Sequence, residues 1–219
     1  MGERSRSSEQ QDRAPLIGRS RTAHFPAARW HLRDATATIH ARLHTHPSLA
    51  SLASSRIGRQ AYAALLLRLY GFHAPLEQNL ACAGRASEFG SAVSPRSRVR
   101  LLWKDLRDLD VTAEAIAAAP RIAQTALPPL DCPGRLLGCI YVCAGSTLGG
   151  RVLARALDPL FGPSETAGRR FFTGFEDDAE HWRNCCATIE EVAQAGHLPD
   201  MVASATETFT AFEQWLSAD

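Results

Sequence analysis

Two features of this sequence have the residue types and spacing for chemistry, and the first is a histidine late in an amphipathic segment. Arg33 precedes His40 by seven residues, so a helix would place both on one face, about 10 Å apart along its axis. Imidazole is a common metal ligand, and a planar dianionic ligand would want iron at its middle and a cation at its edge. From this segment alone, a partly buried histidine beside a solvated arginine is the favoured interpretation, because the pattern has low specificity.

The second feature is a run of small residues, Gly-Ser-Thr-Leu-Gly-Gly at 145–150, inside an apolar helical segment. We call it the glycine run. Each glycine in a helix interior costs about 1 kcal/mol relative to alanine, so three within six residues need a reason. A backbone that must approach another body closely and a helix that must bend are the usual reasons. A flat ligand pressed against a kinked helix satisfies both. The alternative, favoured for this run taken alone, is a helix crossing with small residues at the contact.

Other histidines offer competing metal sites. His44 lies one turn beyond His40, so a two-histidine site is geometrically possible. The preferred interpretation places His44 at a frayed helix end before Pro47. Two further acid–histidine pairs are spaced i, i+4, and such pairs on facing helices can build a di-iron site in a bundle. They are His73 with Glu77 and Asp177 with His181. The alternative interpretation is that both pairs are exposed and interact only weakly. The sequence shows no convincing second carboxylate-rich helix to complete a di-iron site.

Composition and charge exclude several classes of protein. The chain has 219 residues, 45% of them hydrophobic, and a net charge of +1, so no global field favours nucleic acid. No run of eighteen uninterrupted apolar residues predicts a membrane span, and the N-terminus lacks the apolar core of a secretory signal. The six cysteines do not have the spacing of a structural zinc site. We therefore expect reduced thiols and a cytoplasmic location.

The elements that must position these residues are all helical. Residues 1–28 are polar, slightly basic and without hydrophobic period, which predicts a disordered tail; residues 29–219 predict one helical domain. The apolar spacing predicts a single-domain all-α bundle. Pro75 should kink or split the second helix. The expected helices are 31–44, 58–82, one opened by Pro95 and running through Leu106, 112–118, 133–157 through the glycine run, 174–195 and 199–217.

Taken together, these segments resemble the heme oxygenase family. The early helix matches the family pattern L-[KR]-x-A-T-x-x-x-H at residues 32–40, and the glycine run matches the distal pattern G-[DS]-x-x-G-[GA]. Residues 168–172, Gly-Arg-Arg-Phe-Phe, and the C-terminal segment 208–216 match as well. The resemblance spans roughly residues 30–217 and is strongest to the bacterial branch, which includes enzymes that supply biliverdin to bacteriophytochromes. The fold it implies holds heme between a proximal helix and a kinked distal helix.

The resemblance implies a role for each matching residue. His40 would ligate the heme iron and Arg33 would pair with a propionate. Gly145 and Gly149 would let the distal backbone close on the porphyrin, and with Ser146 they would form the catalytic wall. Bound oxygen would then meet backbone N–H groups and ordered water, which delivers protons. Three more residues complete the implied heme contacts: Thr147, Gly150 and Arg183.

Two departures from the family pattern affect the chemistry. Ser146 stands where many members carry an aspartate that anchors the distal water; a hydroxyl can donate and accept a hydrogen bond but adds no charge. His44 stands where several relatives have glutamate one turn after the ligand. Bacterial relatives share the serine, so the departure at Ser146 does not exclude activity.

The implied activity is the oxidative cleavage of heme to biliverdin, carbon monoxide and ferrous iron, with heme as both substrate and cofactor. The reaction would consume oxygen and electrons. The electrons would come from an external donor of the ferredoxin or flavoprotein reductase type, because no flavin or nicotinamide motif is present. A bacteriophytochrome is an expected recipient of the product; nucleic acid and membrane are not expected partners. The alternatives are a non-catalytic heme carrier on the same fold and, ranked lower, a di-iron oxidase of that fold.

Overall fold

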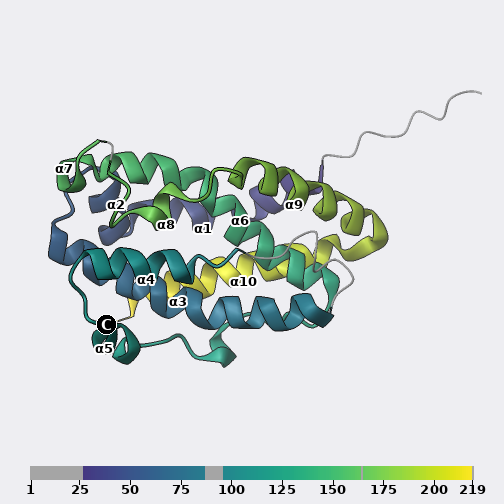
Figure 1. Ribbon diagram of the computed structural model, residues 1–219. Helices are drawn as coiled ribbons and strands as arrows, with labels where there is room; N and C mark the ends of the chain where they lie inside the picture. The colour runs from purple at the N-terminus through teal and green to yellow at the C-terminus, as the bar shows by residue number, and fades with distance from the viewer. Residues whose placement is uncertain (1–26, 87–95, 164, 219) are drawn as a thin grey trace, which may run out of the picture.

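The computed structural model describes residues 27–86, 96–163 and 165–218, and every regular element within these ranges is helical. The predicted all-α class is therefore confirmed. In Figure 1 the yellow helix α10 runs through the middle of the molecule, and it packs against α1, α3 and α6. The elements in chain order are α1 (Ala28–Thr45), α2 (Pro47–Ala53), α3 (Arg59–Ala86), α4 (Val99–Asp108), α5 (Ala113–Ala118), a 3-10 turn (Gln124–Ala126), α6 (Pro133–Ala156), α7 (Asp158–Phe161), α8 (Arg170–Thr173), α9 (Asp178–Val192), a π turn (Ala193–His197) and α10 (Leu198–Ser217).

Helix α1 is held in place at both ends by glutamates from other helices. At its N-terminus, Glu190 of α9 accepts hydrogen bonds from the backbone N–H groups of Ala28, at 2.7 Å, and Arg29, at 3.3 Å. This satisfies two otherwise unpaired donors and places a negative charge at the positive end of the helix. Near its C-terminus, Arg42 donates two hydrogen bonds to Glu213 of α10. The helix starts three residues before the prediction, so Ala28 is helical and the predicted tail boundary is late; residues 1–26 lie outside the described ranges.

Helix α3 is one helix of 28 residues, so of the two outcomes predicted for Pro75, a kink or a split, the split is wrong. Pro75 has no N–H to donate to the Gly71 carbonyl one turn earlier. That carbonyl instead accepts a hydrogen bond from the backbone N–H of Ile122, at 3.1 Å. The segment before α6 approaches so closely that a Cβ on Gly71 would lie 2.3 Å from the Pro120 carbonyl oxygen. The irregular segment around Ile122 thus supplies the hydrogen bond that proline removes.

Helix α6 is the central apolar helix, and its glycines let other backbones pack against it. A Cβ on Gly138 would lie 2.2 Å from the carbonyl oxygen of Met201 in α10, and one on Gly150 would lie 2.6 Å from that of Phe172 in α8. Within the described residues, α6 is the one helix long and apolar enough to cross a membrane, with a mean hydropathy of 1.4 over its best window. Its packing against α8, α9 and α10 accounts for that apolar composition.

The first four residues of the predicted helix 174–195 form a turn instead. Helix α8 ends at Thr173, and α9 begins only at Asp178. Gly174 adopts φ = 72°, a region that favours glycine, and a Cβ there would lie 2.2 Å from a carboxylate oxygen of Asp178. The same carboxylate accepts the Phe175 N–H at 2.8 Å and so closes the turn. The short helices α2, α7 and α8 were not predicted, because segments this brief carry too little periodic signal.

Candidate functional site

Helix α1 presents His40 on an exposed stripe together with Arg33, Ala37 and His44. The spacing i, i+4, i+7 and i+11 brings these four residues onto one face, as predicted for Arg33 and His40. The His40 ring lies edge-on to the His44 ring, with 4.6 Å between centroids, and edge-on to the Phe209 ring of α10, at 5.8 Å. One aromatic contact thus steadies the imidazole on the α10 side, while the stripe stays open to a ligand.

His40 has the protonation state that a metal ligand needs. Burial lowers the pKa of His40 below its ordinary value, and the nearby charge of His44 lowers it further. The lowered pKa makes His40 neutral at pH 7, so a ring nitrogen keeps a free lone pair. No group of three or more histidine, cysteine, aspartate or glutamate side chains within the described ranges could hold a metal ion by itself. A metal at His40 would therefore have to arrive in a ligand that brings its own donor atoms.

Helix α6 presents an open apolar face along the glycine run. A Cβ built on Gly149 would meet nothing within 4 Å, whereas one on Gly145 would touch the Trp182 ring at 3.4 Å. Leu148 is 48% exposed and Val152 is 67% exposed, and large apolar side chains are rarely this exposed elsewhere in the described structure. Contiguous exposed apolar surface marks a binding site, and here it surrounds a glycine that leaves the backbone accessible.

The two faces border one region of the molecule. Helices α1 and α6 both pack against α9 and α10. Tyr141 of α6 reaches Thr36 of α1: burial raises the pKa of Tyr141, and hydrogen bonding with Thr36 opposes that rise. On the far side of His40, Leu43 of α1 and Ala154 of α6 belong to one buried cluster, against which Phe209 packs. Along α1, His40 thus lies between Thr36 and Leu43, and along α6 the glycine run lies between Tyr141 and Ala154.

A neutral imidazole on α1 and an exposed apolar face with an accessible backbone on α6 suit a flat, apolar ligand that carries its own metal. The comparisons with known proteins decide which family this is. A family model described as heme oxygenase matches residues 27–218. A heme oxygenase from Xanthomonas campestris pv. campestris (strain 8004) is 31% identical over 172 residues, which is 78% of this chain and 98% of the relative. The chain belongs to the heme oxygenase family.

Solved structures of heme oxygenases share the fold. The structure from Leptospira interrogans matches with a TM-score of 0.66 at 17% identity, over 86% of this chain and all of that one. The Neisseria meningitidis enzyme gives 0.62 at 18% identity, over 87% and 90%. The enzyme of Synechocystis sp. PCC6803 in complex with heme gives 0.61 at 14% identity, over 86% and 92%. The predicted heme oxygenase-like fold is confirmed.

The structure separates the predicted heme contacts of this heme oxygenase family member into two groups. Gly145, Ser146 and Gly149 lie on the accessible side of α6, with Ser146 exposed. Thr147 lies on the opposite side of the helix from Gly149, and its hydroxyl donates to the Ala144 carbonyl at 2.7 Å. Gly150 is buried against α8, as described above. Thr147 therefore faces away from Gly149 and Gly150 packs against α8, and the heme contacts expected of both remain predictions.

The two predicted propionate partners both lie in solvent. Arg33 is exposed on the α1 stripe, and its guanidinium stacks over the Trp30 ring at 5.3 Å. Arg183 is exposed on α9, next to Trp182, whose ring faces Gly145. Each can therefore reach an anionic group at the edge of a ligand without losing a buried partner. Their roles as propionate partners remain predictions.

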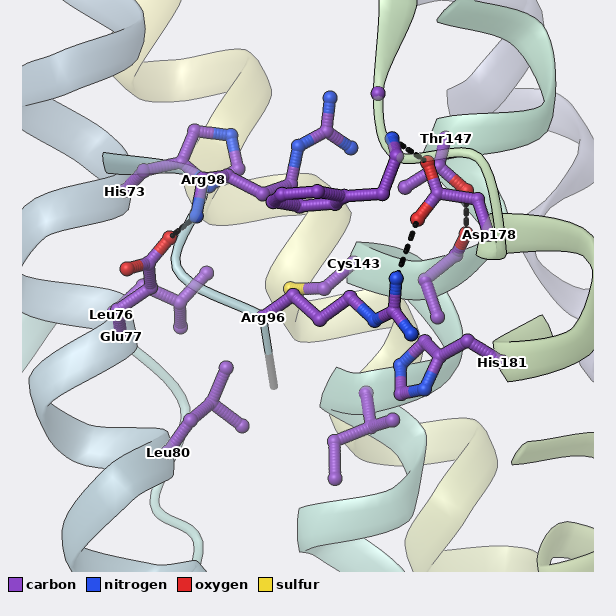
Figure 2. A pocket seen from close by; sticks show the side chains of 14 residues that line it. His73, Leu76, Glu77, Leu80, Arg96, Arg98, Cys143, Thr147, Asp178 and His181 are labelled. Atoms are coloured by element: carbon purple, nitrogen blue, oxygen red, sulfur yellow. Dashed lines mark hydrogen bonds and ion pairs between the residues drawn. The ribbon is translucent and has the colours of Figure 1, made fainter. Parts of the chain in front are cut away.

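A cavity of about 40 Å³ lies on the other side of α6 (Figure 2). His73, Glu77 and His181 line it, as the di-iron alternative requires. Two arginines occupy the space between them: Glu77 accepts the backbone N–H of Arg98, at 2.7 Å, and Arg96 pairs with Asp177. Burial lowers the pKa of His73 to about 3. Positive charge where metal ions would sit makes the di-iron alternative unfavourable.

Arg98 is the functional candidate that sequence reasoning missed. It precedes α4 and is 7% exposed, and one of its terminal nitrogens lies 3.3 Å from the Ser146 hydroxyl oxygen. Forty-eight residues separate the two positions. No periodicity or motif links them, so only the packing of α4 against α3 and α8 reveals the contact.

Proposed function

We propose that this protein is a heme oxygenase that cleaves heme to biliverdin, carbon monoxide and ferrous iron, with oxygen and external electrons. The observation that carries the proposal is the pairing of a neutral, accessible His40 with the open face at Gly149, in a chain that matches the family over nearly all its described length. Heme supplies the iron and the ring that is opened. The residues present fit this substrate, because they offer one axial donor, apolar surface and cations at the rim.

Each residue of the site has a physical task in this proposal. His40 binds the iron through a lone pair that its lowered pKa keeps free. Gly149 and Gly145 let backbone groups of α6 approach the ring, so small ligands meet N–H groups and water rather than a bulky side chain. Ser146 offers a neutral hydrogen-bonding group to that water. Arg33 and Arg183 attract the propionates at the edge of the ring.

The donor, the recipient and the location belong to the same proposal. We infer an external electron donor of the ferredoxin or flavoprotein reductase type, since the sequence carries no flavin or nicotinamide motif. A bacteriophytochrome is the proposed recipient of biliverdin, on the strength of the Gly-Ser-Thr-Leu-Gly form of the glycine run. A cytoplasmic location agrees with six cysteines that are all free in the described structure.

A hemin titration followed by reduction in air tests the proposal. We expect a Soret band at one equivalent, which then decays into the absorption of biliverdin. A Soret band that persists under reductant and oxygen would instead support the heme carrier. The absence of any Soret band, with two equivalents of ferrous iron bound, would contradict both.

A pair of variants locates the ligand. His40→Ala should abolish the native axial ligation while the protein stays helical by circular dichroism. His31→Ala is the matched control, because His31 is exposed on the same helix but on its opposite side. Unchanged heme spectra in His40→Ala would refute the assignment, and His44 would be the next residue to test.

A further inference from the structure

Arg98 brings a buried positive charge to the edge of the glycine run. Its guanidinium stacks over the Phe171 ring at 4.0 Å, and one terminal nitrogen donates to the Phe171 carbonyl at 2.6 Å. The other terminal nitrogen donates to the Ser146 hydroxyl oxygen at 3.3 Å. Two contacts to one residue of α8 fix the plane of the guanidinium, so its position relative to Ser146 is set by the packing of α8.

Arg98 leaves Ser146 with only one way to bond a further group. The Ser146 hydroxyl donates its single proton to the Cys143 carbonyl, at 2.8 Å. Its oxygen has two acceptor sites, and Arg98 occupies one of them. The remaining site belongs to an exposed side chain beside Gly149. Ser146 is therefore a hydrogen-bond acceptor toward any water on the accessible side of α6, as a carboxylate would be, although it carries no charge of its own.

The charge of Arg98 is not neutralised by an ion pair within the described part of the chain. Glu77, the nearest acid along α3, uses one carboxylate oxygen to accept the backbone N–H groups of Arg98 and Val99, at 2.7 and 2.9 Å. Figure 2 shows this contact beside His73, which is neutral because burial lowers its pKa to about 3. Burial lowers the pKa of Arg98 as well, while Asp178, Cys143 and Glu77 oppose the shift. A guanidinium still stays protonated in proteins.

Arg98 also has one buried donor to spare. Its Nε has no hydrogen-bond partner among the described residues. Arg98 lines the cavity of about 40 Å³, which has room for about three or four waters at 10–15 Å³ each. Water is the expected partner of such a buried polar group. A water bound to Nε would be linked through the guanidinium to the Ser146 hydroxyl.

We propose that Arg98 is a positioning residue of the distal side: it holds Ser146 as a hydrogen-bond acceptor and places a positive charge behind the neutral hydroxyl. This rests on the proposed function, because the ligand on the accessible side is heme. The sign of the charge is opposite to that of an aspartate at position 146. A positive charge favours loss of a proton from a nearby group, whereas a carboxylate opposes it.

The acid–alkaline transition of the ferric heme complex, followed by its Soret band, tests the sign. Arg98→Met should raise the midpoint by about 0.6 to 1.2 pH units, the effect of a unit charge roughly 10 Å away at an effective dielectric of about 20–40. Arg98→Lys should keep the midpoint near that of the wild type. Arg100→Met is the control, because Arg100 is exposed two residues further on.

Ser146→Asp gives a second route that leaves Arg98 and its packing in place. The new carboxylate lies beside the guanidinium and cancels its field, so the midpoint should rise as in Arg98→Met. Heme affinity is measured separately by Soret titration, so that midpoints are compared only between folded variants saturated with heme. A midpoint that moves by less than 0.2 unit in folded, heme-binding Arg98→Met and Ser146→Asp would overturn the proposal.

The contact itself can be tested in the heme-free protein, so the inference does not depend on heme binding alone. The Nε–H signal of Arg98 in ¹⁵N NMR spectra should exchange slowly with solvent and should shift in Ser146→Ala. A signal that exchanges fast and does not shift in Ser146→Ala would contradict the inference, whatever the outcome with heme. If instead this signal behaves as expected but no Soret band forms, the proposed function fails while the contact stands.

Discussion

Substitution of Gly149 by alanine separates the two explanations of the glycine run. A Cβ at Gly149 meets nothing within 4 Å in the heme-free structure, and the position lies inside the continuous helix α6. Glycine in a helix interior is about 0.5–1 kcal/mol less favourable than alanine. Gly149→Ala should therefore stabilise the heme-free protein by about 0.5–1 kcal/mol. For a domain of this size, each kcal/mol of stability raises Tm by roughly 2–4 °C.

The same variant should impair the protein when heme is present. If the open face at Gly149 receives the ring, the added methyl occupies space that the ligand needs, and Gly149→Leu should do so more strongly. We expect Gly149→Leu to lose at least tenfold in heme affinity or turnover while its heme-free Tm does not fall. Thermal unfolding by circular dichroism, with and without one equivalent of hemin, measures both effects.

Gly150→Ala is the matched control, one residue further along. Its Cβ would lie 2.6 Å from the Phe172 carbonyl oxygen, so α6 and α8 must move apart. We expect it to destabilise the heme-free protein by about 2 kcal/mol or more, in the range for overpacking. If Gly149→Ala lowers the heme-free Tm as Gly150→Ala does, Gly149 is a packing glycine and the ligand-facing interpretation of the run is wrong.

Three further predictions concern the frame around the site. Gly71→Ala should destabilise the protein by about 2 kcal/mol or more in urea unfolding, because its Cβ would lie 2.3 Å from the Pro120 carbonyl oxygen. Glu190→Ala should cost about 1 kcal/mol in the same assay by uncapping α1, and Glu191→Ala should not. Burial raises the pKa of Asp105 to about 6, so its contribution to stability is full below its ordinary value of 3.8 and lost as the pH rises through 6. Urea unfolding between pH 4 and 7 should show that loss, and Asp105→Asn should remove it.

The sequence predicted the two helices of the site because each carries its own local signal. Buried residues at Leu32, Ile39 and Leu43 gave α1 a regular apolar period. Pro133 and the turn residues after Leu157 marked the ends of α6. The match between the glycine run and the family's distal pattern could also be found from the sequence, because the run is contiguous.

Features that depend on distant contacts could not be predicted in this way. The sequence predicted that Pro75 would kink or split the second helix. The Ile122 N–H donates to the Gly71 carbonyl that proline leaves unbonded, and no residue near position 75 indicates this contact. Thr147 and Gly150 belong to the glycine run by sequence, yet α6 turns them toward the cavity and α8. A motif identifies a segment, whereas the neighbouring helices decide which of its residues face the ligand.

The loss of an acid at position 146 illustrates the same limit and changes the chemistry expected at the site. From the sequence, Ser146 is a neutral replacement that can bond the distal water but adds no charge. In the structure, the serine comes with a buried arginine that bonds it from behind, so the distal flank is positive where an aspartate would make it negative. A water that donates to Ser146 would still have a second O–H to offer as a proton donor. The cation favours proton release rather than proton retention, and the direction of the midpoint shift in Arg98→Met measures that difference.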